Sequence, residues 1–496
     1  MISAIVLVVE LVAFSVCSQQ TDSFRADRVL VCPKPGQDRA LAELHAMERI
    51  SVHRTFPGMG DVQVLQLPEG ANPRAIVAKY QRSRLAQFVE LDYFVQAAAV
   101  PNDPSFTLQW GLSNSGQGPG SLADADIDAP EAWEVRTSAT NVVIAILDSG
   151  VRINHEDLNA NLWRNPGEIP GNGIDDDNNG YVDDIHGADI LNHTGNPFDE
   201  SGHGSIVAGV IGAVGNNGIG VAGVAWKARM MICKFLNASG GGSISDTVEC
   251  FDYARANGAK ILNASFVTTE VSMALSNAIT ACQEAGIILV AASGNSRKDI
   301  DATPFFPASY PHSNIVVVMA TDSADGLYPL NNFGATNVDL AAPGVNIRST
   351  WVVVNDSYVD YTGTSMAAAF VAGAMALVWE QYPEEPYWQI IQRVMAAADP
   401  LPVLAGKCVT GGRLNLKDAL SPRPSLSGVR TTSPGTIAIL LRKGAPDQSY
   451  ALQFSENLSN WISITTNTAS GLGRTDFIAT TEAGPKQGFY RAVEAP

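Results

Sequence analysis

The polar residues best placed for chemistry stand where apolar stretches of the sequence end. Asp148 closes the stretch NVVIAILD, and Asn295 comes just after the stretch GIILVAAS. His203 lies between glycines in SGHGSIVAG, and Ser365 opens the small-residue run in GTSMA. A serine attacks an acyl group only when a base takes its proton, and the base needs a carboxylate to fix its tautomer. Together these residues could supply a nucleophile (Ser365), its base (His203), the orienting carboxylate (Asp148) and an amide donor for an oxyanion (Asn295).

Each of these residues also has an ordinary structural explanation. A serine at the start of a helix is usually a cap, and Ser365 precedes the Ala-rich stretch 366–377, which is typical of a buried helix. A single histidine is more often structural than catalytic, and an asparagine after glycine is often part of a turn. Chemistry is favoured because small residues around His203 and Ser365 leave room for a substrate backbone, and a helix N-terminus stabilises developing negative charge. Of the seven histidines, only His203 stands in such a setting.

The elements that must position these residues alternate between apolar strands and helices from about residue 100 onward. Short runs rich in Val, Ile and Leu span residues 141–148, 229–236, 259–266, 286–293 and 314–321. Helical periodicity marks residues 243–258 and 272–286. Near-continuous apolar strands separated by helices predict an α/β fold with a doubly wound, mainly parallel sheet. Function in such sheets gathers at the carboxyl ends of the strands, where Asp148 and Asn295 stand.

Two smaller modules flank this region. Residues 25–100 alternate strand, helix, strand, helix and strand, which predicts a small α+β module ending in the stretch QAAAVPNDPSF. A Pro-containing stretch of small residues is suited to proteolytic nicking. After about residue 424, short strands separated by Gly, Asn and Pro predict a small β-sandwich. Its aromatic residues Trp461, Phe489 and Tyr490 are more simply explained as core than as a binding site, so we expect an accessory or anchoring role.

The four motifs together resemble those of the subtilisin family of serine peptidases. ILDSGV is similar to the family's Asp motif, GHGSIVAG to its His motif, AASGN to its oxyanion-Asn motif, and GTSMA followed by VAG to its Ser motif. The motifs also occur in the family's order, over roughly residues 105–420. The resemblance implies a serine endopeptidase that hydrolyses peptide bonds of protein or peptide substrates through an acyl-enzyme on Ser365.

The resemblance further implies that the chain is made as a zymogen. Residues 19–100 resemble the family's inhibitory pro-domain, an intramolecular partner whose C-terminal tail occupies the active site until it is cut. We therefore expect a signal peptide at 1–18, the pro-domain at 19–100, a subtilisin-like peptidase domain at 101–422 and the C-terminal β-sandwich at 425–496.

Several positions depart from the family pattern. Ser205 and Ile206 replace Thr and His, Ala369 and Phe370 replace Pro and His, and Val267 and Thr268 replace glycines that line the substrate groove. None of these changes removes a group that transfers a proton or stabilises the oxyanion. They bear on the rate, on the shape of the groove and on the placement of the helix that carries Ser365. The residues expected to line the groove are Ser265, Phe266, Val267, Ala292, Ser293 and Gly294.

The stretch GIDDDNNGYVDD, residues 173–184, predicts a structural Ca²⁺ site. Its spacing matches an EF-hand-type loop, in which carboxylate and carbonyl oxygens at alternate positions bind calcium. The expected ligands are Asp175, Asp177, Asn179, the carbonyl of Tyr181, and Asp183. His186 stands where a closing Glu is usual, so Asp184 or a distant group must serve. The alternative is a solvated acidic loop, although carboxylates this close repel one another strongly without a counter-ion.

Composition narrows the class of protein. The chain has 496 residues, 46% of them hydrophobic and 17% charged, which describes a globular protein with a large core. Its formal net charge of −18 argues against a nucleic acid partner. Residues 2–17 form an imperfect secretory signal, because the run lacks a basic start and contains Glu10; a retained anchor and a mis-set start are the alternatives. No later run reaches the about 18 apolar residues of a membrane helix. We therefore expect a secreted or cell-surface protein with no stable membrane span in its mature form.

The six cysteines are sparse and lack metal-binding spacing. Cys233 fits a free thiol in a buried strand, whereas Cys250 and Cys282 fall on consecutive predicted helices, so a disulfide between them stays open.

A second hypothesis comes from another class of protein. The substituted positions near His203 and Ser365 would also suit a catalytically weak or inactive peptidase fold that acts as a surface-binding protein. Its C-terminal module, residues 425–496, would then bind a partner saturably, and unfolded proteins would not be hydrolysed.

Overall fold

The computed structural model describes residues 24–93 and 100–421, and the C-terminal segments 425–433, 436–442, 449–455, 462–470, 475–480 and 489–494. The chain divides into two units, one of residues 1–97 with 455–461 and one of residues 98–454 with 462–496. The expected signal peptide at 1–18 lies outside the described residues. In the described part of the chain, no helix combines the length and apolar character needed to cross a bilayer.

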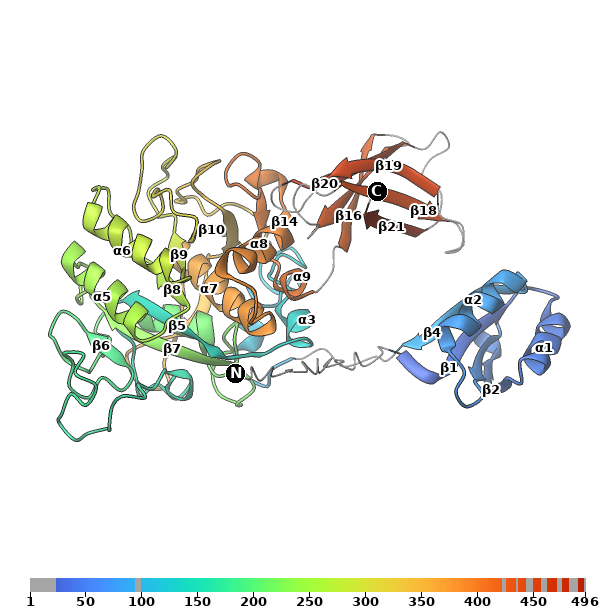
Figure 1. Ribbon diagram of the computed structural model, residues 1–496, viewed down its shortest axis with the longest axis horizontal. Helices are drawn as coiled ribbons and strands as arrows, with labels where there is room; N and C mark the ends of the chain where they lie inside the picture. Colours follow the sequence, from blue (N-terminus) through green and yellow to red (C-terminus); the bar gives the residue numbers. More distant parts are fainter. Residues whose placement is uncertain are drawn as a thin grey trace, which may run out of the picture. The chain divides into compact units, whose positions relative to one another are not determined.

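The N-terminal unit is a four-stranded antiparallel sheet with two helices (Figure 1). Its strands, in the sheet order β2-β3-β1-β4, are β2 (Ser51–Phe56), β3 (Val62–Gln66), β1 (Phe24–Pro33) and β4 (Ala86–Tyr93). Helix α1 spans Asp38–Met47, and α2 spans Pro73–Ser83. Helix α2 starts there because the Asn72 side chain accepts a hydrogen bond from the Ala75 N–H and Pro73 occupies the first helical position. The unit has its own small core, which includes Leu41, Leu65 and Tyr80.

The second unit is built on a nine-stranded sheet in the order β14-β15-β11-β10-β9-β8-β5-β7-β6. The strands are β5 (Ser138–Asp148), β6 (Gly187–Asp189), β7 (Lys227–Lys234), β8 (Ile261–Ala264), β9 (Ile288–Ala292), β10 (Ile315–Thr321), β11 (Leu340–Pro343), β14 (Asp399–Pro400) and β15 (Gly412–Arg413). Neighbours pair in parallel from β6 to β15, and the short β14 pairs antiparallel with β15. The five strands expected from the apolar runs are β5, β7, β8, β9 and β10, with ends that differ by three residues at most.

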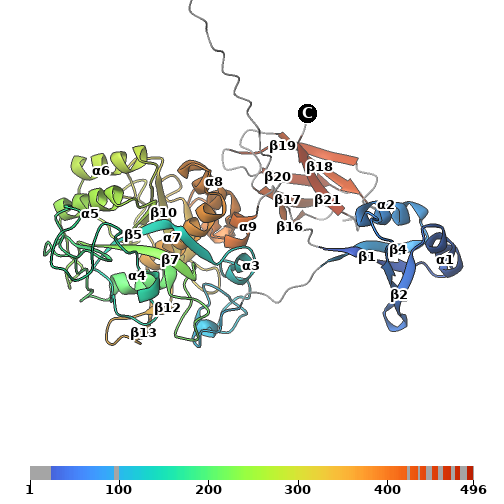
Figure 2. The same cartoon turned by 60° about the horizontal axis from the view of Figure 1, so that its bottom comes forward.

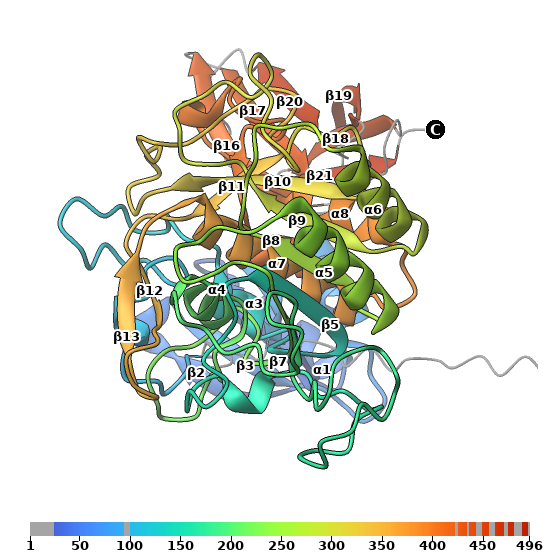
Figure 3. The same ribbon diagram turned by 90° about the vertical axis from the view of Figure 1, so that its left-hand side faces the viewer.

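Helices cover both faces of this sheet. Strand β5 shows why: Ile144 and Ile146 point into one core, and Ala145 and Leu147 point into the other, because successive side chains of a strand face opposite ways. One core contains α4 (His203–Gly212), α7 (Thr364–Gln381) and α8 (Tyr387–Ala397). The other contains α5 (Ile244–Ala256) and α6 (Met273–Glu284), which lie side by side (Figure 3). The expected doubly wound, mainly parallel α/β fold is thereby confirmed.

Helix α7 runs through the middle of its layer and packs against β5, β8, β9 and β10. Its residues from Thr364 to Trp379 are all buried, as expected for a helix that is apolar on every side. Shorter elements complete this layer: α3 (Ala129–Trp133), α9 (Leu416–Leu420), and a hairpin of β12 (Ile347–Thr350) and β13 (Tyr358–Tyr361). Strand β12 of this hairpin packs against α4 (Figure 2).

The C-terminal segments form two three-stranded sheets. One consists of β16 (Ser425–Ser433), β17 (Thr436–Arg442) and β20 (Thr475–Thr480), and the other of β19 (Ile462–Thr468), β18 (Ser449–Ser455) and β21 (Phe489–Glu494). Ile439, Phe477 and Tyr450 belong to one small core that draws side chains from both sheets. Trp461 and the side chains of Phe489 and Tyr490 lie outside the described residues, so the accessory role of this module stays a prediction.

Candidate active site

The structure brings Asp148 and His203 into direct contact. Asp148 is the last residue of β5, and His203 is the first residue of α4. The Nδ1 atom of His203 lies 2.8 and 2.9 Å from the two carboxylate oxygens of Asp148, which is fully buried. The approach requires glycine at position 204, because a Cβ there would lie 2.0 Å from the carbonyl oxygen of Gly150. The strand end and the helix start therefore hold a carboxylate–imidazole pair.

The charge of this pair suits a histidine that must accept a proton. Burial lowers the pKa of His203, but the charge and hydrogen bond of Asp148, together with the charge of Asp199, outweigh burial and raise it. The carboxylate side chain also fixes the tautomer, since Nδ1–H donates to Asp148 and Nε2 is left free to act as the base.

Ser365 is the second residue of α7, and it does not cap that helix. The N-cap is Gly363, and no side chain makes a cap hydrogen bond. The hydroxyl of Ser365 instead donates to the carbonyl oxygen of Ser265 at 3.4 Å, and the hydroxyl of Ser265 donates to the carbonyl oxygen of Ser365 at 3.3 Å. This reciprocal link joins the start of α7 to the end of β8.

Asn295 is oriented by the same helix. Its side-chain oxygen accepts a hydrogen bond from the N–H of Thr364 at 3.0 Å, so the amide NH₂ group is the part available to an oxyanion. Thr364 also accepts a hydrogen bond from the N–H of Gly294 through its hydroxyl, at 3.2 Å. Thr364, the residue before Ser365, thus fixes the Gly294–Asn295 turn against the start of α7.

A groove of about 630 Å³ runs past His203 and Ser265. Of the residues expected to line it, Ser265, Phe266 and Val267 do so, next to His203. Ala292 and Ser293 are buried instead. Ala292 ends the central strand β9, whose side chains face the two cores, and Ser293 follows it with its hydroxyl donating to the carbonyl oxygen of Asn332 at 3.1 Å. Gly294 has a φ of 101°, and a Cβ there would lie 2.5 Å from the Asn332 side chain.

Sequence reasoning missed one side of this groove. Residues 238–244 line it together with Phe235, Leu236 and Tyr361. The signal was present in the glycine-rich stretch NASGGGS, residues 237–243, which follows β7 at the carboxyl end of the sheet.

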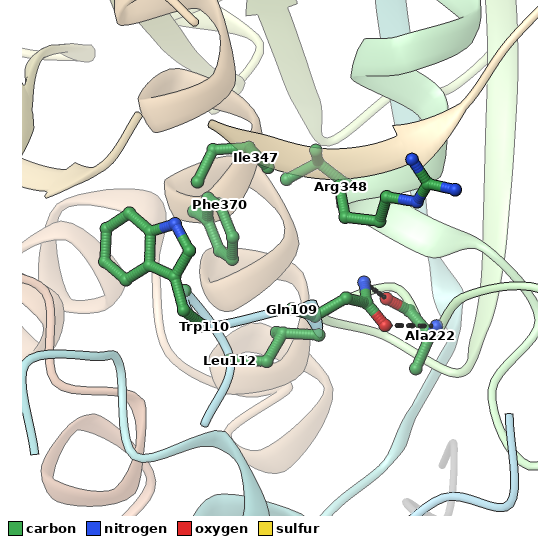
Figure 4. A pocket seen from close by; sticks show the side chains of 9 residues that line it. Gln109, Trp110, Leu112, Ala222, Ile347, Arg348 and Phe370 are labelled. Atoms are coloured by element: carbon green, nitrogen blue, oxygen red, sulfur yellow. Dashed lines mark hydrogen bonds between the residues drawn. The ribbon is translucent and has the colours of Figure 1, made fainter. Parts of the chain in front are cut away.

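Two of the departures from the family pattern are well accommodated. Phe370 is 3% exposed and packs beside Trp110 and Ile347 (Figure 4). A Cβ at Gly111 would lie 2.7 Å from its ring, so the glycine makes room for the aromatic side chain. Ile206 is fully buried in the core that contains α4. Both residues act through packing and leave the Asp148–His203 contact intact.

The acidic loop gathers a set of carboxylates that differs from the expected one. Oxygens of Glu168, Asp175 and Asp177 lie within 4.8 Å of one another. Glu168 lies upstream of the predicted loop, and its sequence signal is an acidic residue in the Gly- and Pro-rich stretch NPGEIPGNG. Asn179 joins this group, since its side-chain NH₂ donates to Asp177 at 3.1 Å and to Asp184 at 2.8 Å.

The side chains of Asp183 and Tyr181 make hydrogen bonds outside the Glu168–Asp175–Asp177 group. Asp183 accepts hydrogen bonds from the N–H groups of Gly171, Asn172 and Gly173 at 2.7, 3.2 and 3.0 Å, so it holds a turn. The expected ligand from Tyr181 is its backbone carbonyl. Its side-chain hydroxyl donates to Glu249 on α5 at 2.5 Å.

The cysteines Cys32, Cys233, Cys250, Cys282 and Cys408 are all buried and free. The disulfide considered between Cys250 and Cys282 does not form, and burial raises the pKa of Cys282 to about 12.

Comparison with known proteins identifies the family of this chain. A profile of the subtilase family matches residues 139–418, which is more than half of the chain. The chain belongs to the subtilase family. It is 34% identical over 337 residues to subtilisin-like protease 1 of Plasmodium berghei, covering 64% of this chain and 54% of that protein. It is 33% identical over 283 residues to thermitase of Thermoactinomyces vulgaris, covering 57% of this subtilase and 86% of that protein.

A solved protease of Pseudoalteromonas arctica PAMC 21717 has a similar fold. The match has a TM-score of 0.53 and 27% identity, and it covers 65% of this subtilase and 99% of that chain. This subtilase spans about half the length of the Plasmodium relatives that it matches.

Proposed function

We propose that this subtilase is a secreted serine endopeptidase, made as a zymogen, that hydrolyses peptide bonds of proteins or peptides through an acyl-enzyme on Ser365. The observation that carries the proposal is the 2.8 Å contact between Asp148 and His203 in a groove whose wall, Ser265, is hydrogen-bonded to Ser365. His203 on α4 and Ser265, which is hydrogen-bonded to Ser365 on α7, line the same groove, and this arrangement supports the proposal.

The chemistry follows from the position of each group. His203 takes the proton of the Ser365 hydroxyl through Nε2 while the serine oxygen attacks the scissile carbonyl carbon. Asp148 holds the imidazole and stabilises the imidazolium that forms. Asn295 and the N–H of Ser365 donate hydrogen bonds to the oxyanion, aided by the dipole of α7. The imidazolium then protonates the leaving amine. In the second half of the reaction His203 takes a proton from water as the water oxygen attacks the acyl carbon; the bond to the Ser365 oxygen breaks, that oxygen receives the proton back from His203, and the acyl group leaves as a carboxylic acid.

Two observations support an inhibitory role for the N-terminal unit. It has its own sheet and core, and the stretch that follows it has the composition of a cleavage site. The N-terminal apolar run supports secretion, as does the name of a relative in Xanthomonas campestris, which is 31% identical and is called an extracellular protease. We infer that the pro-domain blocks the groove until it is cut, and that the mature protein is released or held at the cell surface.

Calcium binding is proposed as a structural part of this function. The donor set fits, because Ca²⁺ prefers oxygen ligands and three carboxylates stand within 4.8 Å of one another. Glu168, Asp175 and Asp177 would hold the ion, which would neutralise their mutual repulsion. None of them touches the groove, so calcium would support the fold and take no part in the reaction.

An active-site-directed fluorophosphonate tests the proposal. The mature wild-type protein should be labelled at Ser365, and Ser365→Ala should lose the label and retain the N-terminal unit, as read by mass spectrometry. Ser265→Ala is the matched control, because it removes the neighbouring hydroxyl and should still be labelled. A folded, mature wild-type protein that stays unlabelled would support the rival, an inactive surface-binding protein.

A further inference from the structure

Asp199 is a buried carboxylate for which the proposed reaction has no direct use. It is 1% exposed and stands four residues before the catalytic histidine. One of its oxygens accepts hydrogen bonds from the Ser149 hydroxyl at 2.9 Å and from the N–H groups of Ser201 and Gly202 at 2.9 and 2.8 Å. The other accepts from the N–H and hydroxyl of Ser205 at 2.9 and 2.7 Å. Five donors thus offset the cost of burying this charge.

These hydrogen bonds connect the two halves of the catalytic pair. Ser149 follows Asp148, and its N–H donates to an oxygen of Asp148 at 2.7 Å. The hydroxyl of Ser149 donates to Asp199 and accepts from the N–H of Gly204 at 3.0 Å. Asp199 therefore ties the turn after β5 to the first turn of α4, one residue to either side of His203.

The segment that carries Asp199 is itself fixed. The N–H of Asp199 donates to the carbonyl oxygen of Val151 at 3.3 Å. On the other side, the ammonium group of Lys234 donates to the carbonyl oxygen of Phe198 at 2.8 Å and to Glu200 at 2.9 Å. Lys234 is 1% exposed and ends β7, where it pairs in register with Asp148. The segment that carries Asp199 is thus anchored to the turn after β5, the strand that ends in Asp148, and to the neighbouring strand β7.

We propose that Asp199 is a positioning residue of this peptidase: it holds the Asp148 turn and the His203 helix in register and directs a second negative charge toward the imidazole. The kinetic part of this inference rests on the proposed function, whereas the structural part does not. Loss of Asp199 should leave the base less well aligned and its protonated form less stabilised.

The charge environment of His203 supports this role. Among the described residues, Asp148 on β5 and Tyr361 on β13, whose ring centroid lies 6.1 Å away, are in contact with the ring, and Asp199 before α4 acts on it through its charge. After the opposing effect of burial, the two carboxylates raise the pKa of His203. Asp199→Asn keeps the shape of the side chain but removes one of these charges, so the pKa should fall.

Titration of His203 tests the charge without requiring activity. In the full chain carrying Ser365→Ala and ¹³C-labelled histidine, Asp199→Asn should lower the pKa of His203 by about half a pH unit or more. The matched control is Ser149→Ala, which removes a hydrogen bond to Asp199 but no charge and should leave the pKa nearly unchanged. An unchanged pKa in folded Asp199→Asn would overturn the proposal.

Kinetics test the alignment. In mature enzyme, Asp199→Asn should lower kcat by about tenfold or more with little change in KM, because misplaced catalytic groups cost rate more than binding. The acid limb of its kcat/KM profile should move to lower pH, whereas Ser149→Ala should lower kcat and leave that limb in place. If Asp199→Asn does not fold, wild-type kcat in both Ser149→Ala and Ser205→Ala would overturn the proposal. An inactive wild-type protein would refute the proposed function, and the titration would still decide the role of Asp199.

Discussion

Among single residues, Val267 has the most direct consequence for substrate choice. It is 40% exposed in the groove, and one of its methyl groups lies 3.5 Å from where a Cβ on Gly294 would stand. Asn295, the proposed oxyanion donor, follows Gly294. In the proposed mechanism, the substrate side chain just before the scissile bond therefore passes close to this contact. Val267 therefore narrows the groove at a point where the family typically has glycine.

We predict that Val267→Gly lets the groove accept larger substrate side chains at the position just before the scissile bond. The ratio of kcat/KM for Phe over Ala should rise by about tenfold, since one to two buried carbon groups are worth that much discrimination. A peptide library read by mass spectrometry measures the ratio. Val271→Gly is the matched control, because Val271 is 69% exposed and does not line the groove. An equal shift in both variants would contradict the role of Val267.

Among the elements, α7 depends on the packing of Phe370. This side chain is 3% exposed and fills the space that Gly111 leaves beside Trp110 (Figure 4). Phe370→Ala should lower the free energy of unfolding by about 3–5 kcal/mol, because it leaves a cavity in a closely packed core. Urea denaturation of the Ser365→Ala protein, which cannot digest itself, gives the value. Phe370→Leu should cost clearly less, and equal losses would argue against a cavity effect.

The acidic loop gives a prediction for calcium. Thermal unfolding of the Ser365→Ala protein should occur at a lower temperature in excess chelator and recover when calcium is added. An ion bound only by the folded state stabilises it by about 2.7 kcal/mol at a hundredfold excess over Kd. The double change Asp175→Asn with Asp177→Asn should abolish the calcium response.

Asp183→Asn provides the contrast for that experiment. Asp183 holds the 171–173 turn through three backbone N–H groups, so its loss should lower the melting temperature both with and without calcium. If the Ser365→Ala protein with the wild-type loop melts at the same temperature in calcium and in chelator, the proposed site is contradicted.

Across the whole second unit, Asp128 joins segments that are far apart in the chain. It accepts a hydrogen bond from the Asn415 side chain at 2.8 Å, and Asn415 also donates to Asp399 at 3.0 Å. Burial and the neighbouring carboxylates Asp399 and Asp126 raise the pKa of Asp128 to about 7. Arg413, which is 3% exposed, forms ion pairs with Asp325 and Asp399 and so neutralises part of the negative charge of these carboxylates.

The raised pKa of Asp128 predicts how stability depends on pH. The folded protein keeps this carboxyl protonated below about pH 7, whereas the unfolded chain ionises it from the ordinary 3.8 upward. Its contribution to stability is therefore complete at pH 4 and is lost as the pH rises to 7. Asp128→Asn removes the titration and suits the left-handed backbone there, with a φ of 55°. In urea denaturation, the variant should gain stability over wild type at pH 8 and gain little at pH 4; a pH-independent difference would contradict this assignment.

The strands, the principal helices and the four catalytic candidates followed from the sequence. Strand β5 could be predicted because buried strands need an unbroken run of Val, Ile and Leu, whichever core each side chain enters. Asp148 and Asn295 could be singled out as candidates because they stand at or just after the ends of parallel strands, which meet at one edge of the sheet. His203 and Ser365 could be singled out because small residues surround each of them at the start of a helix. Local composition carries this information, and it does not depend on which distant segment packs nearby.

The tertiary structure alone decided which partner each polar group takes. Glu168 joins Asp175 and Asp177, Asp183 turns to the 171–173 backbone, and Asp199 bridges the turns that carry Asp148 and His203. A carboxylate can accept hydrogen bonds from any donor that packing brings within reach, and burial makes the nearest donors compulsory. Those donors come from segments that only the folded sheet places together, so sequence spacing could suggest an acidic site and a catalytic pair but not the hydrogen bonds that hold them.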